Sequence, residues 1–350
     1  MNDSYHERDF QSGSRLGIVE PADGETVPMT KSTADLTVDA CPLCGCRTSV
    51  VIESIPYESI WAELERQLGL ATPVELRRRF TPAPDASLFA CSTCGLEYFS
   101  PHNQGDAAFY AFLTSAEAGY YTNRRWEYSV AEKLLHGSDS LLDIGCGDGA
   151  FLKQVARRVG RAVGVDQNPE GIRELAEAGI EARCTDLSAF AAENAASFNV
   201  VCAFQLLEHL PRVDAFAEAA RRCVAPGGLL LVSVPNNDRP RLNPLDPLDC
   251  PPHHVSRWRP AQLREFARTF QFDLVDVICE RRSPRALPGL LRSLARRTSP
   301  VRHRGAVTSS DAHEGRSERR ARSRRPAPSP RHLRNLFLGH TMILVASRPT

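Results

Sequence analysis

Three groups of residues in this chain have types and spacings that suit chemistry. A glycine-rich turn, Asp143–Gly149, directly follows a short apolar run. Two matched Cys-x-x-Cys-Gly stretches occur at Cys41–Gly45 and Cys91–Gly95, and two prolines and two histidines stand together at Pro251–His254. In that order, such groups are typical of cofactor binding, metal binding and proton transfer.

The turn at Asp143–Gly149 fits two classes of cofactor. Its glycines let the backbone bend sharply and let a ligand approach the main chain. Nicotinamide dinucleotides use G-x-G-x-x-G with an acid about 20 residues further on, whereas the spacing here is G-x-G-x-G. Asp143 and Asp148 would repel a pyrophosphate but would attract a sulfonium that carries an ammonium group. Asp166 is placed to accept hydrogen bonds from both ribose hydroxyls. Together, the glycine spacing and these three acids favour S-adenosylmethionine as the cofactor.

The paired cysteines predict a structural zinc site. The two-residue spacing lets both sulfurs of a pair turn toward one ion, and four thiolates make a closed tetrahedral site without a catalytic position. The predicted ligands are Cys41, Cys44, Cys91 and Cys94. Residues 60–68 carry apolar side chains at helical spacing, so we expect a helix inserted between the pairs. Cys46 is a spare thiol and His102 a possible substitute ligand; the alternative is that the cysteines are unrelated core residues.

The elements that must position these groups follow from a change of pattern near residue 137. From there strands and helices alternate, which is typical of a parallel sheet with helices on both faces. The predicted strands span 140–144, 161–165, 181–185, 199–204, 229–234, 272–279 and 340–346. Asp166 and Asp186 then follow the second and third strands, at the edge where ligands of such sheets bind.

At this point the chain resembles the class I S-adenosylmethionine-dependent methyltransferases. Asp143–Gly149 looks like the first motif of that family, and Leu207–Leu210 and Pro226–Gly228 are similar to later ones. The resemblance covers about residues 120–280 and the last strand. It implies a doubly wound, mostly parallel seven-stranded sheet of the Rossmann-like methyltransferase type, with an antiparallel last strand. The paired cysteines resemble a branch with an N-terminal zinc-binding region, often found in bacterial sugar, polysaccharide or secondary-metabolite pathways.

The resemblance also implies roles for particular residues. The methionine part of the cofactor would contact Asp143, Gly145, Cys146, Gly147, Gln205 and Leu206, and its ribose and adenine would contact Asp166, Gln167, Asp186 and Leu187. Each role has a structural alternative. Asp186 can simply cap the following helix, and Glu208 and His209 can fix their loop rather than take part in chemistry.

The segment Asp249–Trp258 is the predicted acceptor side, because it leaves the carboxyl edge of the sheet. Methyl transfer mainly needs positioning and dehydration, but a hydroxyl acceptor also needs a base. His253 or His254 is the expected base, with His209 behind them; the alternative is that both histidines hold the loop. No carboxylate follows the pair at close spacing, so we expect no metal there. Transfer to carbon through a stabilised carbanion stays open.

The sequence divides into a polar tail at 1–36, a zinc-ribbon-like region at 37–100, a helical aromatic linker or lid at 101–136, and a methyltransferase domain at 137–350. We expect the tail to be disordered. In the lid reading, Tyr120, Tyr121 or Arg124 would touch the ligand. A basic insertion at 281–335 is also expected to be disordered.

The basic insertion dominates the charge distribution. Between Arg281 and His340 there are sixteen arginines, no lysine and three acids, in a chain whose net charge is only +1. Residues 281–334 could be a solvated insertion, bind RNA or DNA through phosphates, rest on an anionic membrane surface, or pair with the acidic body. Eleven cysteines, no signal-like N-terminus and no apolar run near ~18 residues predict a cytoplasmic protein.

These observations predict an S-adenosylmethionine-dependent methyltransferase that acts on a small molecule, a sugar or a natural-product intermediate, through oxygen. Two other classes stay open. One is an RNA or protein methyltransferase that docks through the arginine-rich segment. The other is a non-catalytic binding module with the same fold.

Overall fold

The computed structural model describes residues 38–116, 125–239, 245–281 and 338–350. The predictions for the tail at 1–36, for Tyr120, Tyr121 and Arg124, and for nearly all of the basic insertion lie outside these residues. Within them, no helix has both the length and the apolar character that crossing a membrane requires.

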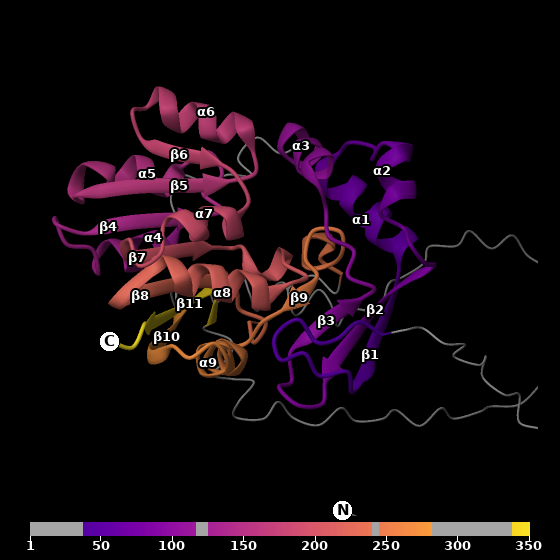
Figure 1. The fold of residues 1–350 in the computed structure, drawn as a ribbon. Coiled ribbons are helices and arrows are strands. Elements are labelled where there is room, and N and C mark those ends of the chain that lie inside the picture. Colours follow the sequence, from indigo (N-terminus) through magenta and orange to yellow (C-terminus); the bar gives the residue numbers. More distant parts are fainter. Residues whose placement is uncertain (1–37, 117–124, 240–244, 282–337) are drawn as a thin grey trace, which may run out of the picture. The chain divides into compact units, whose positions relative to one another are not determined.

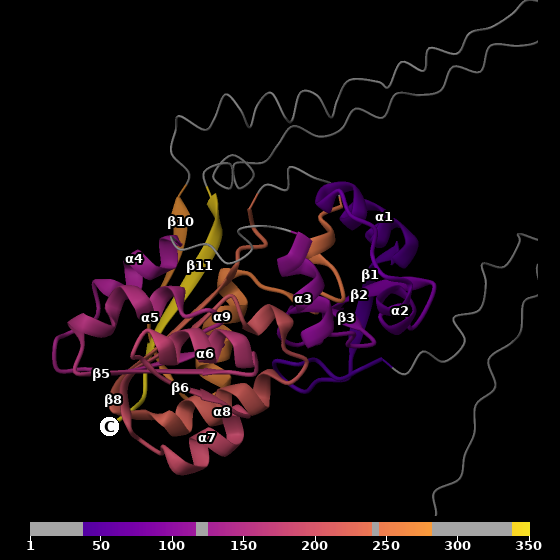
Figure 2. The ribbon, with the colours of Figure 1, turned by 90° about the horizontal axis from the view of Figure 1, so that it is seen from above.

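A seven-stranded sheet forms the larger part of the fold, with strand order β10-β11-β8-β7-β4-β5-β6 (Figure 1). Its strands are β4 (Ser140–Ile144), β5 (Arg161–Asp166), β6 (Glu181–Cys184), β7 (Phe198–Phe204), β8 (Val224–Pro235), β10 (Asp273–Arg281) and β11 (Leu338–Ser347). The last strand, β11, runs antiparallel to both neighbours, while β6, β5, β4, β7 and β8 are parallel. Figure 2 shows β10 and β11 side by side. The expected seven-stranded α/β sheet and its antiparallel last strand are confirmed.

Helices cover both faces of this sheet, as the alternation of its apolar residues shows. Leu141 and Val200 pack in one hydrophobic cluster, whereas their sequence neighbours Leu142 and Val201 pack in the other. Successive side chains of a strand point to opposite faces, so the two clusters lie on opposite sides. One cluster includes α4 (Trp126–Glu132), α5 (Ala150–Val155) and α6 (Pro169–Glu177); the other includes α7 (Leu187–Glu193), α8 (Val213–Cys223) and α9 (Pro260–Thr269). The sheet is therefore doubly wound.

A second, four-stranded sheet carries the cysteine pairs. Its strand order is β1-β2-β3-β9, and its first three strands are β1 (Ser49–Pro56), β2 (Asp85–Cys91) and β3 (Glu97–Ser100). The fourth, β9 (Ser256–Arg257), comes from the segment that contains the histidine pair and pairs antiparallel with β3. The sequence did not indicate this pairing. It joins the predicted acceptor segment to the cysteine region through backbone hydrogen bonds.

Helices α1 (Tyr57–Leu68), α2 (Val74–Arg79) and α3 (Ala107–Ala116) complete this part of the fold. The helix expected between the cysteine pairs is α1, and it buries Ile60, Trp61 and Leu64. Cys250, from the segment before β9, is buried in the same cluster as Trp61. The acceptor segment is thus anchored by both packing and strand pairing.

Candidate active site

The glycine turn after β4 is shaped by left-handed backbone and by close packing of α6. Gly145, Gly147 and Gly149 all have positive φ, between 56° and 76°. A Cβ on Gly171, in the first turn of α6, would lie 2.1 Å from the carbonyl oxygen of Gly147. Only a glycine therefore lets α6 approach the turn this closely. Gly171 was not singled out from the sequence, where no local pattern marks its contact with Gly147.

Asp166 holds the glycine turn in place. Its Oδ2 accepts from the Gly147 N–H at 2.8 Å, and its Oδ1 accepts from the Asn168 N–H at 2.8 Å. Each carboxylate oxygen has a second lone pair for a ligand hydroxyl. Asp186 caps α7, with its Oδ1 accepting from the N–H groups of Ser188 and Ala189 at 2.8 and 3.3 Å. The capping alternative for Asp186 is thus realised by one of its oxygens.

Asp143 is a buried carboxylate with 3% of its surface exposed. Burial raises its pKa well above the usual value, the nearby Asp166 carboxylate raises it further, and Arg125 acts in the opposite direction. A positively charged ligand beside Asp143 would favour its ionised form. The electrostatics at this end of the site therefore suit a cation.

One cavity of about 880 Å³ brings the predicted residues together. Its lining includes all ten residues expected to bind the cofactor, namely Asp143, Gly145, Cys146, Gly147, Asp166, Gln167, Asp186, Leu187, Gln205 and Leu206. The same lining includes His209, His253 and His254. The expected cofactor side and the expected acceptor side thus face one continuous space.

Gln205 and Leu206 connect the two sides of the cavity. Gln205 has a left-handed backbone, with φ of 53°, and its N–H donates to the carbonyl of Ser233 at 2.9 Å. Its side-chain Nε2 donates to the buried Glu127 at 3.2 Å. The Leu206 side chain lies against Gly145, where an added Cβ would come within 3.1 Å of it. The positions of Gln205 and Leu206 are therefore tied to β8, α4 and the glycine turn.

The three histidines form a cluster although His209 is far from the others in the sequence. Ring centroids are 4.8 Å apart for His209–His253 and His209–His254, and 4.4 Å apart for His253–His254. Burial lowers the pKa of His209 and of His253 to about 3, and that of His254 to about 4. At neutral pH all three rings are uncharged.

Hydrogen bonds orient these rings through their Nδ1 atoms. His209 Nδ1 lies 2.6 Å from the His253 carbonyl oxygen, and His253 Nδ1 lies 2.8 Å from the Leu248 carbonyl oxygen. A carbonyl oxygen only accepts, so the proton of His253 is on Nδ1 and its Nε2 carries a lone pair. His209 also has a backbone hydrogen bond to Gln205, so either of its ring nitrogens can carry the proton. The Tyr110 hydroxyl also lies 2.9 Å from His209 Nδ1.

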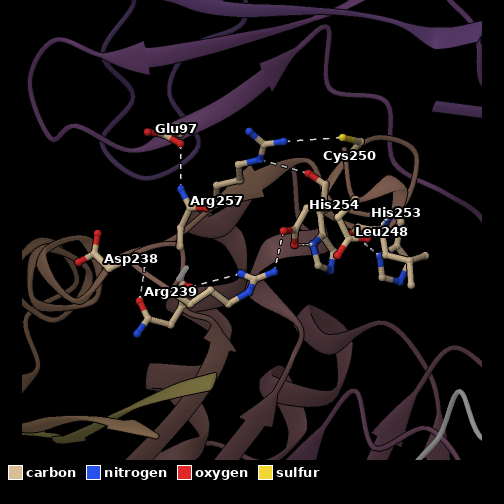
Figure 3. A network of polar contacts seen from close by, with 12 residues as sticks. Glu97, Asp238, Arg239, Leu248, Cys250, His253, His254 and Arg257 are labelled. Carbon is tan, nitrogen blue, oxygen red and sulfur yellow. Dashed lines mark hydrogen bonds and ion pairs between the residues drawn. The ribbon is translucent and has the colours of Figure 1, made fainter. Parts of the chain in front are cut away.

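Arg239 and Arg257, labelled in Figure 3, hold the histidine segment through contacts with Asp249. His254 Nδ1 lies 3.4 Å from Asp249 Oδ1, and Arg239 donates to Asp249 Oδ2 at 2.6 Å. Arg257 donates to the Asp249 carbonyl at 3.2 Å and stacks over the Phe99 ring at 5.0 Å. These groups are buried, so the network fixes His254 and joins its segment to β3.

Glu208 is buried beside the cluster, with 1% of its surface exposed. Among the described residues, neither of its carboxylate oxygens has a hydrogen-bond partner. Burial raises its pKa to about 8. Its Oε1 lies 3.8 Å from His209 Nε2. Its backbone carbonyl does accept from the Val255 N–H at 2.8 Å, so Glu208 fixes the loop through its main chain while its carboxylate remains available.

The two cysteine pairs come together as two nearly identical turns. Gly45 N–H donates to the Cys41 carbonyl at 2.8 Å, and Gly95 N–H donates to the Cys91 carbonyl at 3.0 Å. The sulfurs of Cys41 and Cys94 are 3.6 Å apart, and those of Cys44 and Cys91 are 3.5 Å apart. Zinc–sulfur bonds of about 2.3 Å in a tetrahedron place sulfurs about 3.8 Å apart. The donor set therefore fits a zinc ion.

Cys46 and His102, the two alternative ligands considered from the sequence, do not belong to this cysteine group. The ligand atoms of the group lie within 4.8 Å of one another. Cys46 instead accepts from the Thr93 hydroxyl at 3.1 Å. His102 lies 3.9 Å from Asp39.

Comparison with known proteins identifies part of the chain. Residues 116–277 match a family model described as a methyltransferase domain. This segment contains every residue predicted at the cofactor and acceptor sides, but neither cysteine pair. This stretch of the chain is thus similar to methyltransferase domains.

The curated relatives are similar over a shorter stretch. A ubiquinone biosynthesis O-methyltransferase of Xanthomonas oryzae is 29% identical over 136 residues, which cover 33% of this chain and 57% of the relative. A ubiquinone biosynthesis O-methyltransferase of Psychrobacter cryohalolentis is 31% identical over 117 residues, which cover 31% of this chain and 45% of the relative. The chain spans about half the length of the curated relatives it matches.

Among solved structures, a SAM-dependent methyltransferase from Archaeoglobus fulgidus has a TM-score of 0.48 and 16% identity, and the match covers 69% of this chain and 100% of that one. The [4+2]-cyclase SpnF has a TM-score of 0.41 and 21% identity, and the match covers 64% of this chain and 80% of SpnF.

Proposed function

We propose that the protein is an S-adenosylmethionine-dependent methyltransferase that transfers a methyl group to a hydroxyl oxygen of a small-molecule acceptor. The observation that carries this proposal is the single cavity that the glycine turn and the histidine cluster share. The methyltransferase-domain match over residues 116–277 supports the reaction, and the names of the relatives support oxygen as the acceptor atom.

On the cofactor side, the residues present fit S-adenosylmethionine. The turn from Gly145 to Asp148 lines the cavity, and Asp143 offers a buried carboxylate near the expected ammonium group. Asp166 ends β5 and Asp186 follows the neighbouring strand β6, so Asp166 would bind the ribose and Asp186 the adenine. When bound, the cofactor supplies a methyl group activated by a positively charged sulfur.

On the acceptor side, the chain orients a hydroxyl. The buried rings of His253 and His254 face the cavity from a segment held by strand pairing and arginine contacts. A neutral ring with its proton on Nδ1 accepts a hydrogen bond at Nε2. An acceptor hydroxyl donating to this nitrogen would present its oxygen lone pair to the methyl carbon.

A small acceptor suits the size of the cavity. Cavities of roughly 300–1,000 Å³ are typical of small-molecule sites, and this one has about 880 Å³ to share between cofactor and acceptor. A sugar or a natural-product intermediate, the class that the sequence resemblance implies, presents hydroxyls that can meet the histidines. We assign the zinc ion to the four cysteines as a structural ion, because that site has no open coordination position.

The experiment is transfer of an isotopically labelled methyl group from S-adenosylmethionine to a panel of hydroxylated sugars and phenols, analysed by mass spectrometry. His253→Ala/His254→Ala should lower turnover by at least about 100-fold, since general acid–base groups contribute 10²–10⁴. His136→Ala, an exposed histidine outside the cavity, is the matched control and should keep full turnover. Label found on carbon, or unchanged turnover in the double variant, would contradict the proposal.

A further inference from the structure

The histidine cluster has the geometry of a metal site. One ring nitrogen from each of His209, His253 and His254 lies within 4.8 Å of the others. The sequence argument considered only the adjacent pair and carboxylates near it in the chain. The fold adds a third imidazole, from the loop after β7.

The hydrogen bonds around the rings also favour a metal site. Metal-binding histidines usually donate their other N–H to a carbonyl or a carboxylate, which fixes the tautomer and orients the ring. Here His253 donates from Nδ1 to a carbonyl, and His209 Nδ1 lies against another carbonyl. His254 Nδ1 faces the Asp249 carboxylate, which Arg239 holds in turn. The Nε2 atoms of His253 and His254 are then the lone-pair nitrogens.

Glu208 supplies an independent observation. An ionised carboxylate buried without a partner is costly, and a neighbouring cation removes that cost. Both of its oxygens are buried and lack hydrogen-bond partners among the described residues, yet Glu208 lines the cavity beside His209. A cation at the cluster would satisfy this group.

We propose that His209, His253 and His254 bind a divalent transition-metal ion of the zinc class, with the Glu208 carboxylate beside His209 as its counter-charge. Imidazole with carboxylate suits such ions rather than magnesium or calcium. Nitrogens around tetrahedral zinc lie about 3.4 Å apart, so the ion draws the three rings closer than they are here. Building on the proposed function, the ion replaces the direct hydrogen bond from the acceptor hydroxyl to a ring nitrogen, and the hydroxyl oxygen becomes a further ligand of the ion.

The ion makes the acceptor hydroxyl more acidic, so no ring has to accept its proton. A metal-bound hydroxyl is more acidic than a free one, as metal-bound water is. Its O–H bond breaks and the proton leaves to bulk water. The oxygen lone pair then forms the bond to the methyl carbon, while the electrons of the breaking carbon–sulfur bond stay on sulfur.

The test is the metal content of the whole protein after incubation with excess Zn²⁺ and removal of free ion. Wild type should hold one equivalent more than His253→Gln/His254→Gln, and His136→Gln should match wild type. Glu208→Gln should weaken the extra site by about 10-fold or more. With Co²⁺, the thiolate charge-transfer bands of the cysteine site should be unchanged in the double variant, which shows that this site and its fold are intact.

Equal metal content in wild type and the double variant overturns the metal site, and the rings then only hold their segment. Calorimetry with S-adenosylhomocysteine on the same samples separates this result from failure of the proposed function. Binding of S-adenosylhomocysteine without the extra ion rejects the metal site alone. No binding in folded wild type rejects the proposed function, whatever the metal content.

Discussion

At the scale of single residues, buried carboxylates set the electrostatics of the cavity. Asp143 and Glu208 line it, and Glu127 lies behind Gln205. Burial raises the pKa of all three. Proteins keep such costly groups where a ligand charge or a defined orientation requires them. We therefore assign Asp143 to the cofactor, Glu208 to an ion, and Glu127 to the orientation of Gln205.

Glu127 allows a prediction about stability and pH. Its folded pKa is raised, chiefly by burial, above the ordinary value of 4.5. Between these two values the unfolded chain has lost the proton and the native protein keeps it, so the contribution of Glu127 to stability falls as pH rises. Glu127→Gln lacks this dependence and can still accept from Gln205. The difference in melting temperature between Glu127→Gln and wild type should therefore grow in favour of the variant from pH 4.5 to pH 8.

The control for this measurement is Glu193→Gln, which changes an exposed carboxylate at the end of α7. It should follow wild type at every pH. A Glu127→Gln advantage that shrinks with rising pH would contradict the assignment of a raised pKa.

At the scale of elements, the site depends on how closely α6 meets the glycine turn. Gly171→Ala would place a methyl group 2.1 Å from the Gly147 carbonyl, and that atom belongs to the backbone. Alanine favours a helix, but the clash should dominate. We expect a loss of about 1–3 kcal/mol of stability, typical of overpacking, and weaker binding of S-adenosylhomocysteine.

Gly137→Ala is the matched control. A Cβ there would meet its nearest neighbour, the Arg158 carbonyl, only at 3.9 Å. Denaturant unfolding measures the stability of both variants, and calorimetry measures how tightly each binds S-adenosylhomocysteine. If Gly171→Ala is as stable as Gly137→Ala and binds equally well, the close approach of α6 does not shape the turn.

The elements also show which parts of the site were predictable from the sequence. The turn, Asp166 and Asp186 follow local patterns, because parallel strands bring their carboxyl ends to one edge. By contrast, β9 has only two residues and no periodicity of its own, so its pairing with β3 left no local signal. The meeting of His209 with His253 joins residues far apart in the chain, which depends on the tertiary fold. Gly171 left no local signal either, because the contact that requires a glycine there is with Gly147, which lies elsewhere in the chain.

At the scale of the whole molecule, the cysteine region and the acceptor segment form one connected structure. Strand β9 and the Arg257 contacts link the segment around His253 to the sheet that carries the cysteines. We infer that the proposed zinc ion stabilises the acceptor side more than the cofactor side, since the glycine turn belongs to the other sheet.

Cys94→Ser tests this connection. Metal analysis should show loss of one zinc per chain, and retained stoichiometric zinc would contradict the site. Methyl transfer should fall by about 10-fold or more, since a small misplacement of reacting groups is costly, while binding of S-adenosylhomocysteine changes little. Cys184→Ser, an exposed cysteine outside the cluster, is the control. Equal loss of cofactor binding and turnover would show general unfolding instead.

The most direct test of the central claim is calorimetric titration of the folded protein with S-adenosylhomocysteine. Wild type should bind one equivalent, and Asp143→Asn should bind at least about 10-fold more weakly, since a charge-assisted hydrogen bond contributes ~1.5–3 kcal/mol. Glu193→Gln should bind like wild type. Wild-type affinity should also fall as pH is lowered through the raised pKa of Asp143, because only its ionised form attracts the ammonium group. No binding, or equal binding by Asp143→Asn, would contradict the account.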